Sequence, residues 1–427
     1  MNVCVVALGK IGLPLAVQFA AKGHRVVGAD VNPAVVEQVN AGNEPFPGEA
    51  ELDLRLKQAV TAGLLSATTD TAAAVAASEV VVLVVPLFVD GKGTPDFSLL
   101  DAATEAVAAG LKPGTLVCYE TTLPVGTTRD RWAPLLERGS GLTAGRDFHL
   151  VFSPERVLTG RVFADLRRYP KLIGGIDAAS AEAGRAFYEA ALDFDVRPEL
   201  PRPNGVWDLG SAEAAELAKL AETTYRDVNI GLANQFARFA DRVGVDIAQV
   251  IAACNSQPYS HIHTPGIAVG GHCIPVYPRL YLWNDPEATV VSSARAANAD
   301  MPAYAVDLLA EAYGDLEGAH VLVLGAAYRG GVKETAFSGV FPTVAALRER
   351  GAVPYVSDPL YTETELVALG LPPHRGEPVT AAVIQADHAE YQMLGAADLP
   401  GVRALIDGRR TTDPARWEGV RRVVIGG

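Results

Sequence analysis

Short apolar runs alternate with amphipathic stretches along the first 200 residues of the chain. The runs are almost entirely apolar, which is typical of parallel strands that helices cover on both faces. Repeated strand–helix units of this kind predict a doubly wound parallel sheet. The strands are expected at residues 3–7, 25–29, 80–85, 116–119 and 172–173, and the helices at 14–21, 33–41, 51–62 and 99–109.

The pattern changes after residue 200. Residues 211–243 contain no proline and a single glycine, Gly231, and their apolar positions recur at helical spacing. A helix of this length, on the order of 50 Å, exceeds one globular core, so we expect it to join two domains and to pack against a second copy in a homodimer. A second α/β region follows, with strands expected at 320–324, 353–356, 402–406 and 422–425 and a helix at 341–350.

Charge and cysteine usage narrow the choice of partners and compartment. The chain has 36 Lys and Arg against 50 Asp and Glu, a net charge of −14, and no basic run, so nucleic acid and membrane surfaces are poor partners. No secretory signal pattern begins the chain, and no apolar segment reaches the ~18 residues that cross a bilayer. The four cysteines form no C-x-x-C pair, which favours reduced thiols in a cytoplasmic protein: Cys4, Cys118, Cys254 and Cys273.

A dinucleotide fingerprint follows the first expected strand. Gly9 and Gly12 stand in the sequence ALGKIG, and Asp30 ends the second strand. Gly9 would admit a pyrophosphate beside the backbone, and Gly12 would let helix and strand pack closely. Asp30 would bind the adenosine ribose and repel a 2′-phosphate, which favours NAD over NADP. The first glycine of the pattern is replaced by Ala7, and the alternative interpretation is an ordinary strand–helix turn.

Paired glycines precede one of the cysteines, in the sequence VGGHCIP. Glycines beside Cys273 would expose its thiol, and a thiolate can attack an aldehyde to give a thiohemiacetal that is ready for hydride loss. The alternative is a buried structural cysteine, which we expect of Cys4, Cys118 and Cys254. A metal site is the other alternative, but the spacing resembles no zinc pattern, so we expect none from His261, His263, His272 and Cys273.

Glu216, Lys219 and Thr223 form a polar group on the long helix. Lys219 and Thr223 are four residues apart and point to one side, which otherwise carries apolar residues. Lys219 is then either a solvated residue at the edge of that side or a cation directed at a site, and the pattern alone favours the solvated interpretation.

Taken together, these motifs resemble the UDP-glucose/GDP-mannose dehydrogenase family. The similar stretches occur in the family's order and cover nearly the whole chain: residues 6–14, YETTLPVGTT at 119–128, FSPERVLTG at 152–160, AELAKLAETTYRDVNIGLAN at 215–234, IHTPGIAVGGHCIP at 262–275 and VLVLGAAYR at 321–329. The sequences of these stretches are most similar to the branch that acts on UDP-N-acetylhexosamines, such as UDP-N-acetylmannosamine or UDP-N-acetylglucosamine.

The resemblance implies an α/β fold with two Rossmann-like, doubly wound domains joined by a long central helix. The implied domains are an NAD-binding domain at 1–200, a central helical dimer core at 201–305 that holds Cys273, and a C-terminal UDP-sugar-binding α/β domain at 315–427. It also implies a four-electron oxidation of the C6 alcohol of a nucleotide sugar, a UDP-N-acetylhexosamine or UDP-glucose, to the uronic acid, as polysaccharide biosynthesis requires, with two NAD used in turn.

The resemblance also assigns roles to residues. Cys273 is the nucleophile, Lys219 stabilises the oxyanion, Glu155 acts as acid and base in thioester hydrolysis, and Thr122 positions a water near the nicotinamide. Thr223 completes the catalytic set. The cofactor set is Gly9, Lys10, Ile11, Gly12, Asp30, Pro86 and Thr122. The substrate set is Glu155, Arg156, Val157, Leu158, Lys219, Ile262, His263, Thr264, Gly266, Gly270, Tyr328 and Arg329, where Arg329 replaces the family's usual Lys.

Four positions depart from the family. Thr223 replaces an Asn, Tyr277 an Asp, Tyr259 an Arg that reaches the neighbouring subunit's substrate, and Ala336 an Arg that contacts NAD. These departures keep two alternatives open. One is an NAD enzyme that stops at the aldehyde or acts at another carbon, and the other is a nucleotide-sugar binding protein without catalysis.

Overall fold

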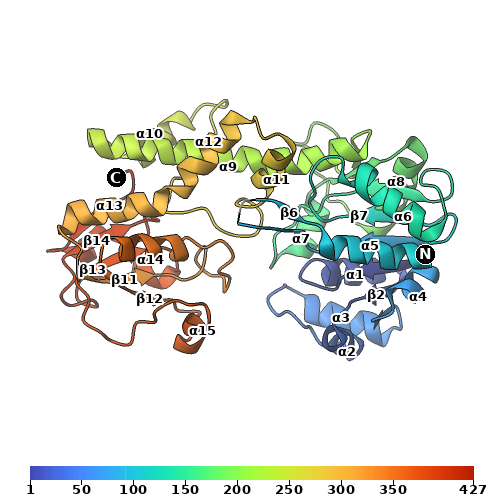
Figure 1. Ribbon diagram of the computed structural model, residues 1–427, viewed down its shortest axis with the longest axis horizontal. Helices are drawn as coiled ribbons and strands as arrows, with labels where there is room; N and C mark the ends of the chain where they lie inside the picture. Colours follow the sequence, from blue (N-terminus) through green and yellow to red (C-terminus); the bar gives the residue numbers. More distant parts are fainter. Residues whose placement is uncertain (92) are drawn as a thin grey trace. The chain divides into compact units, whose positions relative to one another are not determined.

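The computed structural model describes residues 1–91 and 93–427. The chain divides into two compact units, Met1–Ala221 and Glu222–Gly427, each with its own sheet and its own core (Figure 1). Among the described residues, none of the helices combines the length and the apolarity that crossing a membrane requires.

The first unit is built on an eight-stranded sheet with the order β10-β9-β8-β7-β4-β1-β2-β3. The six neighbouring strands β8, β7, β4, β1, β2 and β3 are parallel, as predicted. Strand β9 pairs with β8 in the antiparallel direction, and β10 runs parallel to β9. The prediction of an all-parallel sheet is therefore wrong at this edge, which is where doubly wound sheets often carry reversed strands. The strands are β1 Asn2–Val6, β2 Arg25–Ala29, β3 Leu65–Thr68, β4 Val80–Leu83, β7 Leu116–Tyr119, β8 His149–Phe152, β9 Lys171–Gly175 and β10 Val206–Asp208, with β5 Phe88–Val89 and β6 Pro95–Asp96 in a separate hairpin.

Helices cover both faces of this sheet because its strands are apolar on both sides. Val3 and Val5 of β1 belong to one core cluster, whereas Cys4 and Val6 belong to another on the opposite face. Helices α1, α3, α7 and α8 contribute to the first cluster, and α4, α5 and α6 to the second. The helices are α1 Gly12–Ala21, α2 Pro33–Asn40, α3 Leu52–Thr61, α4 Thr71–Ala76, α5 Ser98–Gly110, the π-helix η1 Thr127–Trp132, α6 Ala133–Ser140, α7 Val162–Arg168 and α8 Ala178–Ala191.

The predicted long helix is a single helix, α9, over Ala212–Val243. Its start and end agree with the prediction to within one residue. Since the boundary between the units falls after Ala221, α9 begins in the first unit and ends in the second.

The second unit has a five-stranded parallel sheet with the order β12-β11-β13-β14-β15. One face packs against α13 and α14 (Figure 1), and the other is covered by short 3₁₀ turns that carry Tyr391 and Trp417. The elements are α10 Ile247–Cys254, α11 Tyr277–Asn284, α12 Thr289–Ala299, α13 Met301–Tyr313, β11 His320–Leu324, α14 Val340–Glu349, β12 Val353–Ser357, α15 Glu363–Ala368, β13 Ala381–Ile384, η2 Ala389–Gln392, β14 Ala404–Asp407, η3 Pro414–Trp417 and β15 Arg421–Val424.

Candidate active site

The fingerprint turn between β1 and α1 has the geometry of a dinucleotide cradle. A Cβ added at Gly12 would lie 1.9 Å from the Ala7 carbonyl oxygen, so only glycine permits this packing of strand and helix. A Cβ at Gly9 would meet nothing within 4 Å, which leaves the backbone open to a ligand. Ala7 has a φ of 74°, in the left-handed region, which explains why the pattern usually has glycine there.

Asp30 follows β2 and is held by two backbone N–H groups. Leu8 N donates to its Oδ2 over 2.8 Å and Asn32 N to its Oδ1 over 2.9 Å. These bonds fix the carboxylate beside the fingerprint turn, where an adenosine ribose would be expected. Lys10, next to Gly9, is exposed, Ile11 is half-buried, and Pro86 is exposed just after β4.

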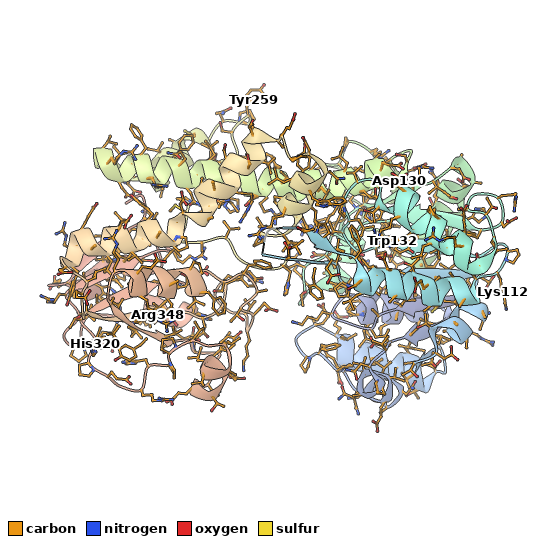
Figure 2. All side chains as sticks on the ribbon, viewed as in Figure 1. Lys112, Asp130, Trp132, Tyr259, His320 and Arg348 are labelled. Atoms are coloured by element: carbon orange, nitrogen blue, oxygen red, sulfur yellow. The ribbon has the colours of Figure 1, made fainter. Side chains whose placement is uncertain are left out.

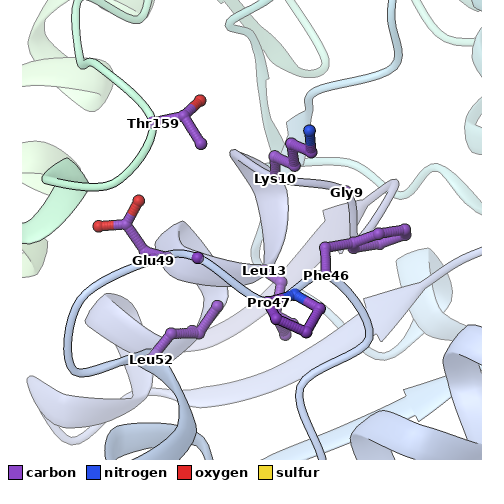
Figure 3. A pocket seen from close by; sticks show the side chains of 9 residues that line it. Gly9, Lys10, Leu13, Phe46, Pro47, Glu49, Leu52 and Thr159 are labelled. Carbon is purple, nitrogen blue, oxygen red and sulfur yellow. The ribbon is translucent and has the colours of Figure 1, made fainter. Parts of the chain in front are cut away.

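A hollow of about 50 Å³ lies beside the fingerprint turn (Figure 3). Glu49, which lines it, is buried and accepts hydrogen bonds from Gly160 N and Val162 N, over 2.6 and 2.7 Å. Glu49 thereby joins two loops that are 111 residues apart, a role that no motif in the sequence indicated. The hollow is lined by Gly9, Lys10, Leu13, Phe46, Pro47, Gly48, Glu49, Leu52 and Thr159.

Two of the expected catalytic residues of the first unit lie just beyond the carboxyl ends of β7 and β8. Thr122 is buried, and its neighbour Thr121 donates to Val85 O over 2.6 Å. Glu155 is half-buried, and its Oε2 accepts from the ammonium of Lys171 over 2.9 Å. Lys171 also donates to Glu120 Oε2, over 2.7 Å. Neither Lys171 nor Glu120 was predicted from the sequence as a site residue.

The next three residues of this loop, 156–158, were also predicted to contact the substrate. Arg156 is half-buried and donates to Pro170 O over 3.4 Å, and Val157 packs against the core. Leu158 is exposed, while its N–H is held by Asp165. These contacts give the loop a defined backbone.

Burial and charge act on Glu120 and Glu155 in opposite directions. Burial raises the pKa of Glu120 to about 7, although the Lys171 ammonium opposes the rise. Burial also acts to raise the pKa of Glu155, but the Lys171 ammonium and its hydrogen bond outweigh burial and hold that pKa below its usual value. Of the two side chains, Glu155 is therefore the one that ionises more readily.

The polar group on α9 is buried. Lys219 is only 8% exposed, so the interpretation of Lys219 as a solvated edge residue is wrong. Thr223 is also buried. Glu216 accepts from Gly126 N, Thr128 N and Thr128 Oγ1, over 2.6, 2.9 and 2.6 Å, and so fastens the loop after Thr122 to the helix. Burial raises the pKa of Glu216 to about 7 against these bonds.

In the second unit, Cys273 is exposed, whereas Cys4 and Cys118 are buried in strands as expected. The loop that carries Cys273 fits closely on Tyr328. A Cβ at Gly270 would lie 2.5 Å from the Tyr328 Cβ, and Gly271 has a φ of 93° and donates to Ala336 O over 2.8 Å. The paired glycines thus bring the thiol loop against the end of β11.

The histidines near this thiol do not gather around it. His272 Nε2 lies 3.1 Å from Glu334 Oε2, and His261 and His263 are exposed. Within residues 1–91 and 93–427, no group of three or more His, Cys, Asp and Glu side chains is placed to hold a metal ion.

Two asparagines of α9 and one half-buried arginine shape the loop at 261–268, and none of the three was predicted from the sequence. Asn229 accepts from His263 N over 2.9 Å and donates to His261 O, and Asn234 accepts from Gly266 N over 2.9 Å. Both lie in the YRDVNIGLAN stretch, which was the available signal.

The arginine is Arg409, whose guanidinium donates to the carbonyl oxygens of Gln385, Ala268 and Tyr328, over 3.0, 3.2 and 3.2 Å. Burial lowers its pKa. Arg409 therefore ties the loop before the thiol to the carboxyl edge of the second sheet. Ile262 is half-buried, Thr264 is exposed, and Arg329 is exposed and donates to the Tyr328 hydroxyl over 3.1 Å.

The positions that depart from the family have different environments. Tyr277 begins α11, and its N–H donates to Cys273 O over 2.9 Å. Ala336 contributes its backbone carbonyl, a contact that any residue could make. Tyr259 is 92% exposed and projects from the loop after α10 (Figure 2).

Comparison with known proteins places the chain among nucleotide-sugar dehydrogenases. Residues 1–192 match the NAD binding domain, and residues 213–300 the central domain, of the UDP-glucose/GDP-mannose dehydrogenase family. The chain is 36% identical over 425 residues to the UDP-N-acetyl-D-mannosamine dehydrogenase of Pyrococcus horikoshii, covering 96% of this chain and 95% of that protein. It is 30% identical over 422 residues to the NDP-N-acetyl-D-galactosaminuronic acid dehydrogenase of Ralstonia solanacearum, covering 96% and 95%.

Two solved structures are similar over nearly their whole length. The UDP-D-ManNAc dehydrogenase of Pyrococcus horikoshii has a TM-score of 0.88 at 34% identity and covers 100% of this chain and 99% of that one. The NDP-N-acetyl-D-galactosaminuronic acid dehydrogenase of Methanosarcina mazei Go1 has a TM-score of 0.87 at 28% identity, with 100% and 95% covered.

Proposed function

Because the chain belongs to the UDP-glucose/GDP-mannose dehydrogenase family, we propose that it oxidises the C6 hydroxymethyl group of a UDP-N-acetylhexosamine to the uronic acid, with Cys273 as the covalent nucleophile. The predicted family, the α/β fold and the NAD cofactor are confirmed, and the chain is an NAD-dependent nucleotide-sugar dehydrogenase. The choice of an N-acetylhexosamine rather than glucose follows the relatives that act on such sugars.

The observation that carries the mechanism is the exposed thiol of Cys273, on a glycine loop seated against Tyr328. Oxidation of the alcohol removes a hydride and a proton and gives the aldehyde. The thiolate then adds to the aldehyde carbon, and the resulting thiohemiacetal loses a second hydride to become a thioester. Water cleaves the C–S bond, which releases the carboxylate and restores the thiol.

NAD supplies the hydride acceptor when it is bound, and the fingerprint turn fits it. The open space at Gly9, the close packing at Gly12 and the fixed carboxylate of Asp30 are the features that a dinucleotide requires. Buried Lys219 would stabilise the oxyanion that forms at the sugar carbon, since a cation out of water acts strongly on a nearby charge. Buried Thr122 would hold the water, and Glu155 would take its proton.

The remaining assignments stay part of this proposal. The substrate would contact the loop from Glu155 to Leu158, the loop from Ile262 to Gly266, Gly270, and the pair Tyr328 and Arg329. The division into domains at 1–200, 201–305 and 315–427 is likewise proposed. The four unpaired cysteines fit the reducing cytoplasm, which is the location we propose.

A panel of nucleotide sugars with NAD tests the function. The right UDP-sugar should release two NADH per sugar, and its product should carry one oxygen more and two hydrogens fewer than the substrate. Cys273→Ser should stop before the acid, whereas Cys254→Ser, at a half-buried cysteine in α10, should not. One NADH per sugar with an aldehyde product would instead support the curtailed reaction. A UDP-sugar that raises Tm without NADH would support a binding protein.

We also propose that the chain is a homodimer. An apolar groove of about 310 Å³ lies along the end of α9 and along α10, and the exposed side chains Phe239 and Val243 flank it. Monomeric proteins rarely leave such contiguous apolar surface in water, and a second copy would cover it. Sedimentation should show a dimer that Phe239→Asp dissociates. Val367→Asp, which is equally exposed on α15, should leave the dimer intact.

A further inference from the structure

Three ionisable side chains come together at the carboxyl ends of β7 and β8, where the antiparallel strand β9 begins. Lys171 lies in β9, Glu120 directly follows β7, and Glu155 is three residues beyond β8. The ammonium of Lys171 donates to both carboxylates, over 2.7 and 2.9 Å. Tyr188 of α8 donates to the other oxygen of Glu120 over 2.7 Å.

The three side chains of this cluster are shielded from solvent, so their charges interact strongly. The side chains of Lys171 and Glu120 are 4% and 0% exposed, and that of Glu155 is 11% exposed. A buried ammonium needs partners, since an unpaired one would be costly. With one cation and two carboxyl groups, the cluster is neutral when one carboxyl is protonated and carries one negative charge when neither is.

Two further titratable groups border the cluster. Cys118 of β7 and Tyr188 of α8 face the cluster, and burial raises the pKa of each, so both stay neutral. Arg156 turns toward Pro170 O and the Tyr169 ring. The Lys171 ammonium also lies 4.8 Å from the centre of the Tyr188 ring.

The two carboxylates differ in what they can reach. Glu120 is enclosed on every side, whereas Glu155 begins a loop that leaves the sheet, and its Oε1 is held by the N–H of Arg156 over 2.7 Å. Glu155 is therefore the member that can meet a water or substrate, and Lys171 and Glu120 can act only through it.

We propose that Lys171 and Glu120 are positioning residues that set the orientation and the proton affinity of Glu155 for thioester hydrolysis. This inference rests on the proposed function, in which Glu155 takes a proton from the attacking water. In that step the water oxygen bonds to the carbonyl carbon, the C–S bond to Cys273 breaks, and the water proton goes to Glu155. Lys171 keeps Glu155 ionised, and Glu120 shares the ammonium, so that Glu155 remains basic enough to accept the proton.

The two positioning residues must then act in opposite directions. An opposite charge this close lowers a carboxyl pKa by about 1–3 units. Lys171→Met removes the cation, so the pKa of Glu155 rises and its basic form survives only at higher pH. Glu120→Gln frees the ammonium to pair with Glu155 alone, so the pKa of Glu155 does not rise. If Lys171 and Glu120 served only folding, the two variants would not shift the Glu155 pKa differently.

The experiment measures thioester decay against pH. Enzyme mixed with NAD and the UDP-sugar is quenched in acid, and the mass adduct on Cys273 is followed over time. In Lys171→Met the acid limb of the pH–rate profile for thioester decay should shift to higher pH by about one unit or more. Lys171→Arg should restore the wild-type profile. In Glu120→Gln the limb should not move up. The first NADH burst should persist in all three variants.

An unmoved limb in folded Lys171→Met, or an upward shift in both Lys171→Met and Glu120→Gln, would overturn the proposal. Glu155→Gln with decay at the wild-type rate would overturn it as well. If Lys171→Met does not fold, the double variant Glu120→Gln with Lys171→Met removes one charge of each sign, and its limb should still move up. A wild-type protein that forms no NADH with any nucleotide sugar would refute the proposed function instead.

Discussion

Replacing Glu216 by glutamine tests how the loop after Thr122 is held. The carboxylate is fully buried and accepts three hydrogen bonds from Gly126 and Thr128, one through Oε2 and two through Oε1. Glutamine has the same shape but keeps only one acceptor atom, so an amide N–H would face one of these donors. A buried donor left without a partner costs about 1–3 kcal/mol.

The loss should appear locally, because these donors belong to the loop and to η1. At about 2 kcal/mol, local opening becomes about 30-fold more frequent, since each 1.36 kcal/mol is a factor of ten. Hydrogen exchange followed by mass spectrometry on a peptide spanning residues 124–132 should accelerate by that factor. Catalytic turnover should fall as well, because the loop carries Thr122.

A matched control lies one turn earlier on the same helix. Glu213 pairs with Arg129 over 2.5 Å, but both side chains are partly exposed, and such a pair contributes about 0–1 kcal/mol. Glu213→Gln should therefore change the exchange of this peptide less than about 5-fold. Equal exchange rates in Glu216→Gln and Glu213→Gln would refute the reasoning.

Two further predictions rest on the backbone at Ala7 and on the contacts of Arg409. Ala7→Gly should hold or raise Tm, since it relieves a left-handed φ worth about 1–2 kcal/mol, and Ala7→Val should lower Tm; a clear loss in Ala7→Gly would count against the strain. Arg409→Met should accelerate hydrogen exchange in residues 262–275, because three partly buried hydrogen bonds to carbonyl oxygens are lost, at about 0.5–1.5 kcal/mol per bond. Unchanged exchange would show that Arg409 does not hold the loop.

The sequence alone determined the elements with strong local signals. Strands 25–29, 116–119 and 320–324 and the helix at 211–243 were predicted to within one residue, because apolar runs and uninterrupted helical spacing are local properties. The fingerprint turn was predicted for the same reason, since it needs only glycines and an acid at fixed spacing. Weak strands escaped, such as β13, Ala381–Ile384, half of which is alanine.

Only the tertiary structure decided the polar contacts between distant segments. The reversed direction of β9 depends on which strand it pairs with, and pairing leaves no mark in the five residues KLIGG. The burial of Lys219 contradicted the helical pattern, because the number of neighbours around a side chain is set by packing and not by its own helix. Lys171 and Glu120 lie 51 residues apart, and Arg409 and Ala268 lie 141 apart. No spacing rule reaches across such separations, so the partners of each charge emerge only once the chain has folded.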